Sequence, residues 1–151
     1  MLYSKKLKEL RIKNNLKQSD LSDYLNIQRG TYSQYESEYI IIPIKHLISL
    51  CDYLNISVDY IFDLNSDEKY KKEKPAFDLK LSSTRLKEFR KENKLTQKKL
   101  SEVLKSDNST ISKYEKGINV IATPFLYDIC KKYNISADYL LGKIDKPKYL
   151  K

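Results

Sequence analysis

The chain has 151 residues and a formal net charge of +9 at pH 7, a length that suits one ordinary domain or two small ones. Its apolar stretches are far shorter than a membrane span of ~20 residues, and no apolar segment typical of a signal peptide follows Met1. We therefore expect a cytoplasmic protein without membrane contact. Cys51 and Cys130 lie far apart with no Cys/His cluster near either, and His46 is the only histidine, so we expect no metal site and no cofactor.

Apolar residues recur with helical spacing through the first 64 residues, and few glycines or prolines interrupt them. The pattern predicts five helices. The first is capped by Ser4 and turns Leu7 and Leu10 inward, and the second starts at Gln18 and buries Leu21, Tyr24 and Leu25. The third is short and turns Tyr32 and Tyr35 inward. The fourth covers 44–54, and the fifth is capped by Ser57.

The second half of the chain repeats the first at an offset of 79 residues without gaps. Of the 54 pairs from Leu7/Leu86 to Tyr60/Tyr139, 22 are identical, which indicates a duplicated domain. The repeat predicts the same helices in the second copy, with the second starting near Gln97, the fourth over 123–133 and the fifth capped by Ser136. Thr96 is the N-cap of the second helix there, where the first copy has the weaker Lys17. We expect domains at 1–64 and 83–151, joined by a polar linker over 65–82 that Pro75 interrupts.

The positive charge is concentrated in the second copy. Residues 1–64 hold eight Lys/Arg and eight Asp/Glu, residues 65–82 hold five and four, and residues 83–151 hold sixteen and eight. A domain this basic points to a polyanionic partner.

The segment LTQKKLSEVLKSDNSTISKYEKG, Leu95 to Gly117, resembles the Cro/phage-repressor (Xre-like) helix-turn-helix family. The first copy, LKQSDLSDYLNIQRGTYSQYESE from Leu16 to Glu38, is similar but has Glu38 where the family favours Gly. The resemblance covers nearly the whole chain except the linker. It implies an all-α protein of two tandem five-helix lambda-repressor-like domains, each with its third helix as recognition helix.

The resemblance also implies which residues contact double-stranded DNA, since a recognition helix enters the major groove, where base edges are distinguishable. The positions that match base-reading or adjacent contacts are Gln18, Arg29, Gly30, Thr31 and Gln34 in the first copy, and Gln97, Asn108, Ser109, Thr110 and Lys113 in the second. Candidate phosphate contacts in the basic copy are Lys98, Lys99, Lys116 and Asn119. For both glutamines a capping role is the structural alternative.

Two charged pairs recur at the same separation, Arg11 with Glu36 and Arg90 with Glu115. In the family that the chain resembles, such a pair joins the first helix to the end of the third. We expect both pairs to be structural and partly buried.

The leading interpretation is a sequence-specific transcriptional regulator of repressor type that binds double-stranded DNA. The near-neutral first copy keeps a second one open, in which one copy serves dimerisation or binds a protein partner, as in an antitoxin. An enzyme is not expected, because there is no nucleophile motif, no phosphate-binding glycine loop and no second histidine. With no separate sensing domain in the sequence, we expect any signal to arrive through a partner, protein turnover or concentration.

Overall fold

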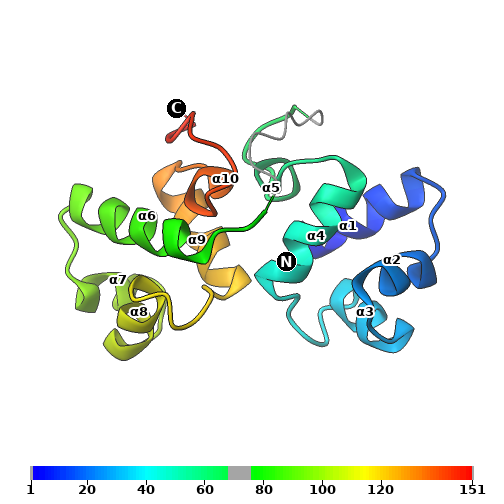
Figure 1. Cartoon of the computed structure of the whole chain (residues 1–151), viewed down its shortest axis with the longest axis horizontal. Coiled ribbons are helices and arrows are strands. Elements are labelled where there is room, and N and C mark those ends of the chain that lie inside the picture. The colour runs from blue at the N-terminus through cyan, green and yellow to red at the C-terminus, as the bar shows by residue number, and fades with distance from the viewer. Residues whose placement is uncertain (1, 68–75, 151) are drawn as a thin grey trace. The chain divides into compact units, whose positions relative to one another are not determined.

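The computed structural model describes residues 2–67 and 76–150, and within them the chain forms ten helices and no strand (Figure 1). It divides into two compact units, residues 1–70 and 71–151. Each unit carries one sequence copy and five helices, so the predicted all-α, two-domain fold is confirmed.

The first unit contains α1 to α5. Their bounds are α1 Leu2–Lys13, α2 Gln18–Leu25, α3 Arg29–Glu36, α4 Ile44–Leu54 and α5 Val58–Ile61. Helix α3 packs against both α1 and α2, while α4 packs against α2 and α5. Helix α3 is therefore held by the first two helices of its own unit.

The second unit repeats this order with α6 to α10. Their bounds are α6 Leu79–Glu92, α7 Gln97–Val103, α8 Asn108–Glu115, α9 Thr123–Tyr133 and α10 Ala137–Leu140. Helix α6 begins four residues before the expected end of the linker, because Asp78 caps it by accepting a hydrogen bond from the Leu81 N–H at 3.1 Å. The end of the expected linker is thus helical, and part of its middle, residues 68–75, lies outside the described residues.

Each core consists of the inward faces of the five helices. Leu7, Leu21 and Tyr32 are almost completely buried in the first unit, and their counterparts Leu86, Leu100 and Ile111 are buried in the second. Tyr24 does not follow the prediction. It is 48% exposed on α2 and pairs with the exposed Tyr53 of α4, with ring centroids 4.5 Å apart. An eight-residue helix buries too narrow a face to include it.

The helix starts follow the predicted capping residues with two differences. Thr96 accepts from the Lys99 N–H at 3.0 Å, and Ser57 and Ser136 cap α5 and α10 in the same way. Lys17 provides no side-chain cap for α2, although the Asp20 carboxylate accepts the Lys17 N–H at 2.7 Å. Ser4 was expected to be an N-cap but lies inside α1, which begins at Leu2, and it is buried.

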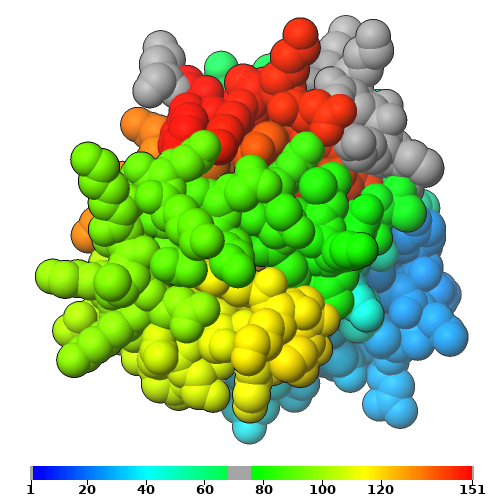
Figure 2. Space-filling model, turned by 60° about the vertical axis from the view of Figure 1, so that its left-hand side comes forward, coloured from blue at the N-terminus to red at the C-terminus, as the bar shows by residue number. Residues whose placement is uncertain are grey.

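After α10 the second unit continues in a tail, residues 141–150, that no helical pattern predicted. Arg85 of α6 holds it by donating to the carbonyls of Tyr139 and Ile144 at 2.7 and 2.6 Å and to the Asp145 carboxylate at 2.8 Å. An isolated antiparallel bridge joins Ile135 to Tyr149. In Figure 2, α6 crosses the middle of this unit, with α7 and α8 along one side and the tail along the other.

The Thr96 cap gives a direct stability test. Thr96→Ala removes the side-chain acceptor at the start of α7 and should lower the free energy of unfolding by about 1 kcal/mol. Thr84→Ala is the matched control, because Thr84 is exposed and bonds only to the Lys80 carbonyl of its own helix. Urea denaturation of both variants checks this, and an equal effect of the two substitutions would contradict the role of the cap.

Candidate nucleic-acid interface

A buried ion pair joins α8, the third helix of the second unit, to α6, the first helix of that unit. The Arg90 Nε lies 2.6 Å from Glu115 Oε2, and its Nη2 lies 3.0 Å from Oε1. The third donor, Nη1, bonds to the Leu95 carbonyl at 2.9 Å. The two side chains are only 11% and 3% exposed. A two-point contact of this kind fixes direction as well as distance.

The first unit contains the same arrangement with nearly the same geometry. Arg11 contacts Glu36 at 2.7 and 3.1 Å and donates to the Leu16 carbonyl at 2.8 Å. The exposures are again 11% and 3%. The prediction of two structural Arg–Glu pairs is therefore confirmed. In each unit one guanidinium connects the first helix, the turn that follows it, and the end of the third helix.

The two glutamines expected at the DNA surface belong to these clusters. The Gln97 amide donates to Glu115 Oε1 at 3.2 Å, and the Gln18 amide donates to Glu36 Oε1 at 3.2 Å. Neither glutamine caps its helix with its side chain. The bond through the amide nitrogen orients each side chain, and its oxygen remains available as an acceptor.

Burial and hydrogen bonds together set the ionisation of Glu36 in the first unit. Burial works against the charge of Glu36, but hydrogen bonds from Arg11 and Gln18 and the adjacent Tyr32 hydroxyl outweigh it, so the pKa of this carboxyl lies below its usual value. Burial, with the Glu36 carboxylate next to it, raises the pKa of the Tyr32 phenol. Glu36 is thus held ionised at neutral pH.

A wide, open hollow covers the outer side of α8, and we call it the α8 surface. It is lined by Gln97, Asp107, Asn108, Ser109, Thr110, Ser112, Lys113, Lys116 and Ile118. Six of these were predicted DNA contacts from sequence, and the fold brings them together on one face. Asp107, Ser112 and Ile118 were not predicted. Ser112 could have been found because it lies one helical turn after Ser109, on the same side of α8.

Asp107 gives the start of α8 its shape. Its carboxylate accepts the Thr110 N–H at 2.8 Å, and this hydrogen bond lowers the pKa of Asp107. The cap leaves Asn108 and Ser109 on the first exposed turn of α8. Both side chains therefore face solvent where a base edge or phosphate can approach.

The other candidates of the basic copy lie around the α8 surface rather than in it. Lys98 and Lys99 are exposed on the first turn of α7, and Asn119 is exposed in the loop after α8. A cation on the first turn of a helix is electrostatically unfavourable, because the helix dipole is positive there. Two lysines at this end lower stability slightly, and they suit a polyanion that binds next to the helix N-terminus.

The first unit presents a less basic version of this face. Arg29 and Gly30 are exposed on the first turn of α3, and Thr31 and Gln34 are half-buried. At the positions equivalent to Lys98 and Lys99 this unit has Ser19 and Asp20, and at those of Lys113 and Lys116 it has Gln34 and Ser37. The two units share the buried Arg–Glu pair, which we call the clamp (Arg11 with Glu36, Arg90 with Glu115). The first unit lacks the four lysines on and around the α8 surface.

Comparison with known proteins agrees with this geometry. A helix-turn-helix family model matches residues 7–61, and a model for a helix-turn-helix domain matches residues 84–146. The chain belongs to the Xre-type helix-turn-helix family and carries its domain twice. The members of this family are regulators rather than enzymes, which confirms the prediction from sequence.

Three curated relatives come from Bacillus subtilis (strain 168). The HTH-type transcriptional regulator ImmR is 42% identical over 59 residues, which are 39% of this chain and 46% of the relative. The uncharacterized HTH-type regulators YobD and YqaE are 32% and 34% identical over 48% and 45% of the chain, covering 65% and 59% of their own lengths. The matches thus span about half to two thirds of the relatives. No solved structure matches the chain.

Two searches of the described residues complete the description of the site. None of the ten helices is long and apolar enough to cross a membrane. Across residues 2–67 and 76–150, no three His, Cys, Asp or Glu side chains are grouped in a way that would hold a metal ion.

The buried pair makes stability depend on pH. Glu36→Gln should cost roughly 3–5 kcal/mol at pH 7, because it leaves the Arg11 charge buried without its partner. Since the folded pKa of Glu36 is lowered, the stability it contributes is fully present above its unfolded pKa of about 4.3 and is lost as pH falls through the folded value. The variant should therefore lose less stability than the wild type on acidification.

Urea unfolding of the whole chain at pH 7 and at pH 3 measures both effects. Glu9→Gln is the matched control, because Glu9 is an exposed residue of the same helix as Arg11. If Glu36→Gln and Glu9→Gln had equal stability at pH 7, the pair would not hold the recognition helix in place.

Proposed function

We propose that the chain is a sequence-specific regulator of transcription that binds double-stranded DNA in the major groove with α3 and α8. The observation that carries the proposal is the α8 surface, where polar side chains on the exposed turns of a recognition helix lie beside Lys113 and Lys116. Such a surface combines hydrogen-bonding groups for base edges with cations for phosphates. The bacterial relatives are named as transcriptional regulators, which supports the same function.

The second unit should supply most of the affinity for DNA. Residues 83–151 carry sixteen of the 29 Lys/Arg against eight of the 20 Asp/Glu. Binding to DNA releases roughly one counterion for each phosphate that a cation neutralises, so this unit should dominate the salt dependence of DNA binding.

A DNA-binding role places the protein in the cytoplasm of a bacterial cell. We favour repression, because a small bound chain excludes other proteins from its site.

Base-reading and phosphate-binding residues should respond differently to substitution. Asn108→Ala and Arg29→Ala should each change the preferred sequence, at a cost of about 1–3 kcal/mol against one base pair, because a lost bidentate contact affects one position. Lys98→Gln should weaken binding to all sequences alike and reduce the slope of log K against log salt by about 1. Selection from a random DNA pool, followed by salt titration, measures both.

Lys132→Gln is the control for charge alone, because Lys132 is exposed near the end of α9 rather than on α7 or α8. Its salt slope should equal that of the wild type. An unchanged selected site for Asn108→Ala would show that α8 does not read bases.

A second function is favoured for the first unit by its surface. Tyr39 is 79% exposed, and the exposed rings of Tyr24 and Tyr53 lie against each other on α2 and α4. Exposed aromatic residues on a neutral domain are typical of protein interfaces. In this alternative the first unit forms a homodimer or binds a protein partner, and only the second unit reads DNA. Sedimentation of the DNA complex gives the number of chains per DNA site. One chain per site would exclude the homodimer.

A further inference from the structure

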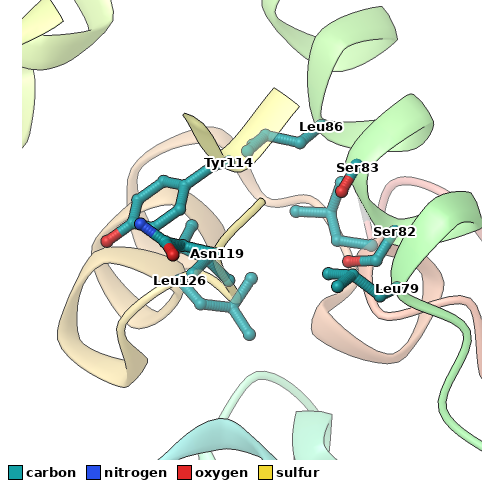
Figure 3. Close-up of a pocket in the computed structure, with 9 residues that line it drawn as sticks. Leu79, Ser82, Ser83, Leu86, Tyr114, Asn119 and Leu126 are labelled. Carbon is teal, nitrogen blue, oxygen red and sulfur yellow. The ribbon is translucent and has the colours of Figure 1, made fainter. Parts of the chain in front are cut away.

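A hollow in the second unit is lined by helix α6, the end of α8, the loop after it, α9 and α10 (Figure 3). Its empty space is about 290 Å³ with the open mouth included, and its walls are mainly apolar. The side chains that matter here are Leu79, Ser82, Ser83, Tyr114, Asn119 and Leu126. All of them belong to the second unit, so the hollow is a feature of that unit alone.

One polar atom in this hollow lacks a partner. Ser83 is only 6% exposed, and its hydroxyl forms no hydrogen bond to any residue that the structure describes. A buried hydroxyl without a partner is less stable than one that is bonded, because it has lost its hydrogen bonds to water. In Figure 3 the hydroxyls of Ser82 and Ser83 lie on the α6 side of the hollow, opposite Tyr114 and Asn119. The site thus has an apolar body and a polar atom that is free to bond.

The first copy has larger apolar or aromatic residues at two of the positions that line the hollow. At the repeat offset, Ser82 corresponds to Tyr3 and Asn119 corresponds to Ile40. Tyr3 is 2% exposed, and its ring packs on Phe62 with centroids 5.5 Å apart. The first unit therefore fills with its own tyrosine ring a position where the second unit has a serine. A serine at this position removes a large side chain from the lining beside Ser83.

We propose that the hollow of the second unit is a binding site for a small aromatic molecule of the phenol type. The ring of the ligand lies against the lining residues Leu86 and Leu126, and a polar atom of the ligand bonds to the Ser83 hydroxyl. The enclosed part of the hollow is narrow and has room for about one water molecule. A ring enters as Leu79, half-buried on the first turn of α6, moves aside.

The position of the site connects it to the recognition helix. Tyr114 lies on α8, and its hydroxyl accepts the Ala122 N–H at 3.3 Å, while Asn119 is a predicted phosphate contact. A ligand that contacts both residues shifts the position of α8 and of the loop that follows it. This regulatory consequence rests on the proposed function, but the binding itself does not.

The test uses p-cresol, the tyrosine side chain as a free molecule, with the full-length chain and no DNA. Titration followed by amide NMR should shift the resonances around Ser82, Ser83 and Asn119. Those around Tyr3 and Ile40 should stay constant, because the matching place is filled there. Ser82→Tyr should weaken p-cresol binding at least tenfold and raise the melting temperature, since it introduces the ring of the first unit.

A second pair of measurements separates the ring from the hydrogen bond. Ser83→Ala should lower the affinity for p-cresol roughly fivefold. It should leave the affinity for toluene, which has no hydroxyl, unchanged. If Ser82→Tyr does not fold, Asn119→Ile supplies the other residue of the first unit and should also weaken p-cresol. Shifts spread over both units, or equal binding by wild type and the folded variant, would overturn the proposal, and so would a hollow that takes up only water.

The effect on DNA is measured separately, by titrating the selected DNA with and without p-cresol. A changed DNA affinity in the wild type that is absent in Ser82→Tyr supports the regulatory consequence. Local p-cresol binding in a chain without sequence-specific DNA affinity would sink the proposed function and leave the ligand site standing. Specific DNA binding without local NMR shifts on adding p-cresol would support the proposed function and overturn the ligand site.

Discussion

In each unit one buried, two-point ion pair joins the first helix to the end of the third helix, α3 or α8. The guanidinium of Arg90 contacts both oxygens of Glu115 and also the Leu95 carbonyl, so it joins α6, the following turn and the end of α8. A planar fork on a carboxylate resists rotation as well as separation. An eight-residue helix has little surface of its own to pack, so this contact adds to the packing of Ile111 and Tyr114 in fixing how α8 lies.

The same clamp carries different surfaces in the two units. Arg11 and Glu36 reproduce the distances of Arg90 and Glu115 to within about 0.1 Å. Outside the clamp, four lysines of the second face are replaced by uncharged or acidic residues in the first. The interior of a domain tolerates little change without loss of packing, whereas exposed residues change at small cost in stability. Divergence after duplication has thus altered the surfaces and preserved the support.

Much of this fold could be predicted from the sequence, because its signals are local. The starts of α2 and α7, the bounds of α4 and α9, and the capping Thr96, Ser57 and Ser136 all follow from spacing and N-cap residues. The Arg–Glu pairs came from the family resemblance and are confirmed. The repeat strengthened each prediction, since two copies had to agree.

What could not be predicted depends on contacts between distant residues. The exposure of Tyr24, the early start of α6 and the tail held by Arg85 arise from tertiary packing that no periodic pattern encodes. The hollow beside Ser83 was missed for the same reason, although the exchange of Tyr3 for Ser82 was visible in the aligned copies. For the candidate DNA contacts, the fold places six on one face, and their roles stay predictions.

Photo-cross-linking of the full chain to its selected DNA tests the central claim that α8 reads the major groove. Ser109→Cys attaches the probe to the exposed first turn of α8, while Asp128→Cys attaches it to an exposed position on α9. The natural Cys51 and Cys130 are buried, which protects them from labelling. We predict cross-links to bases from position 109 and none from position 128. Equal cross-linking from the two positions, or cross-links from 128 alone, would contradict the account.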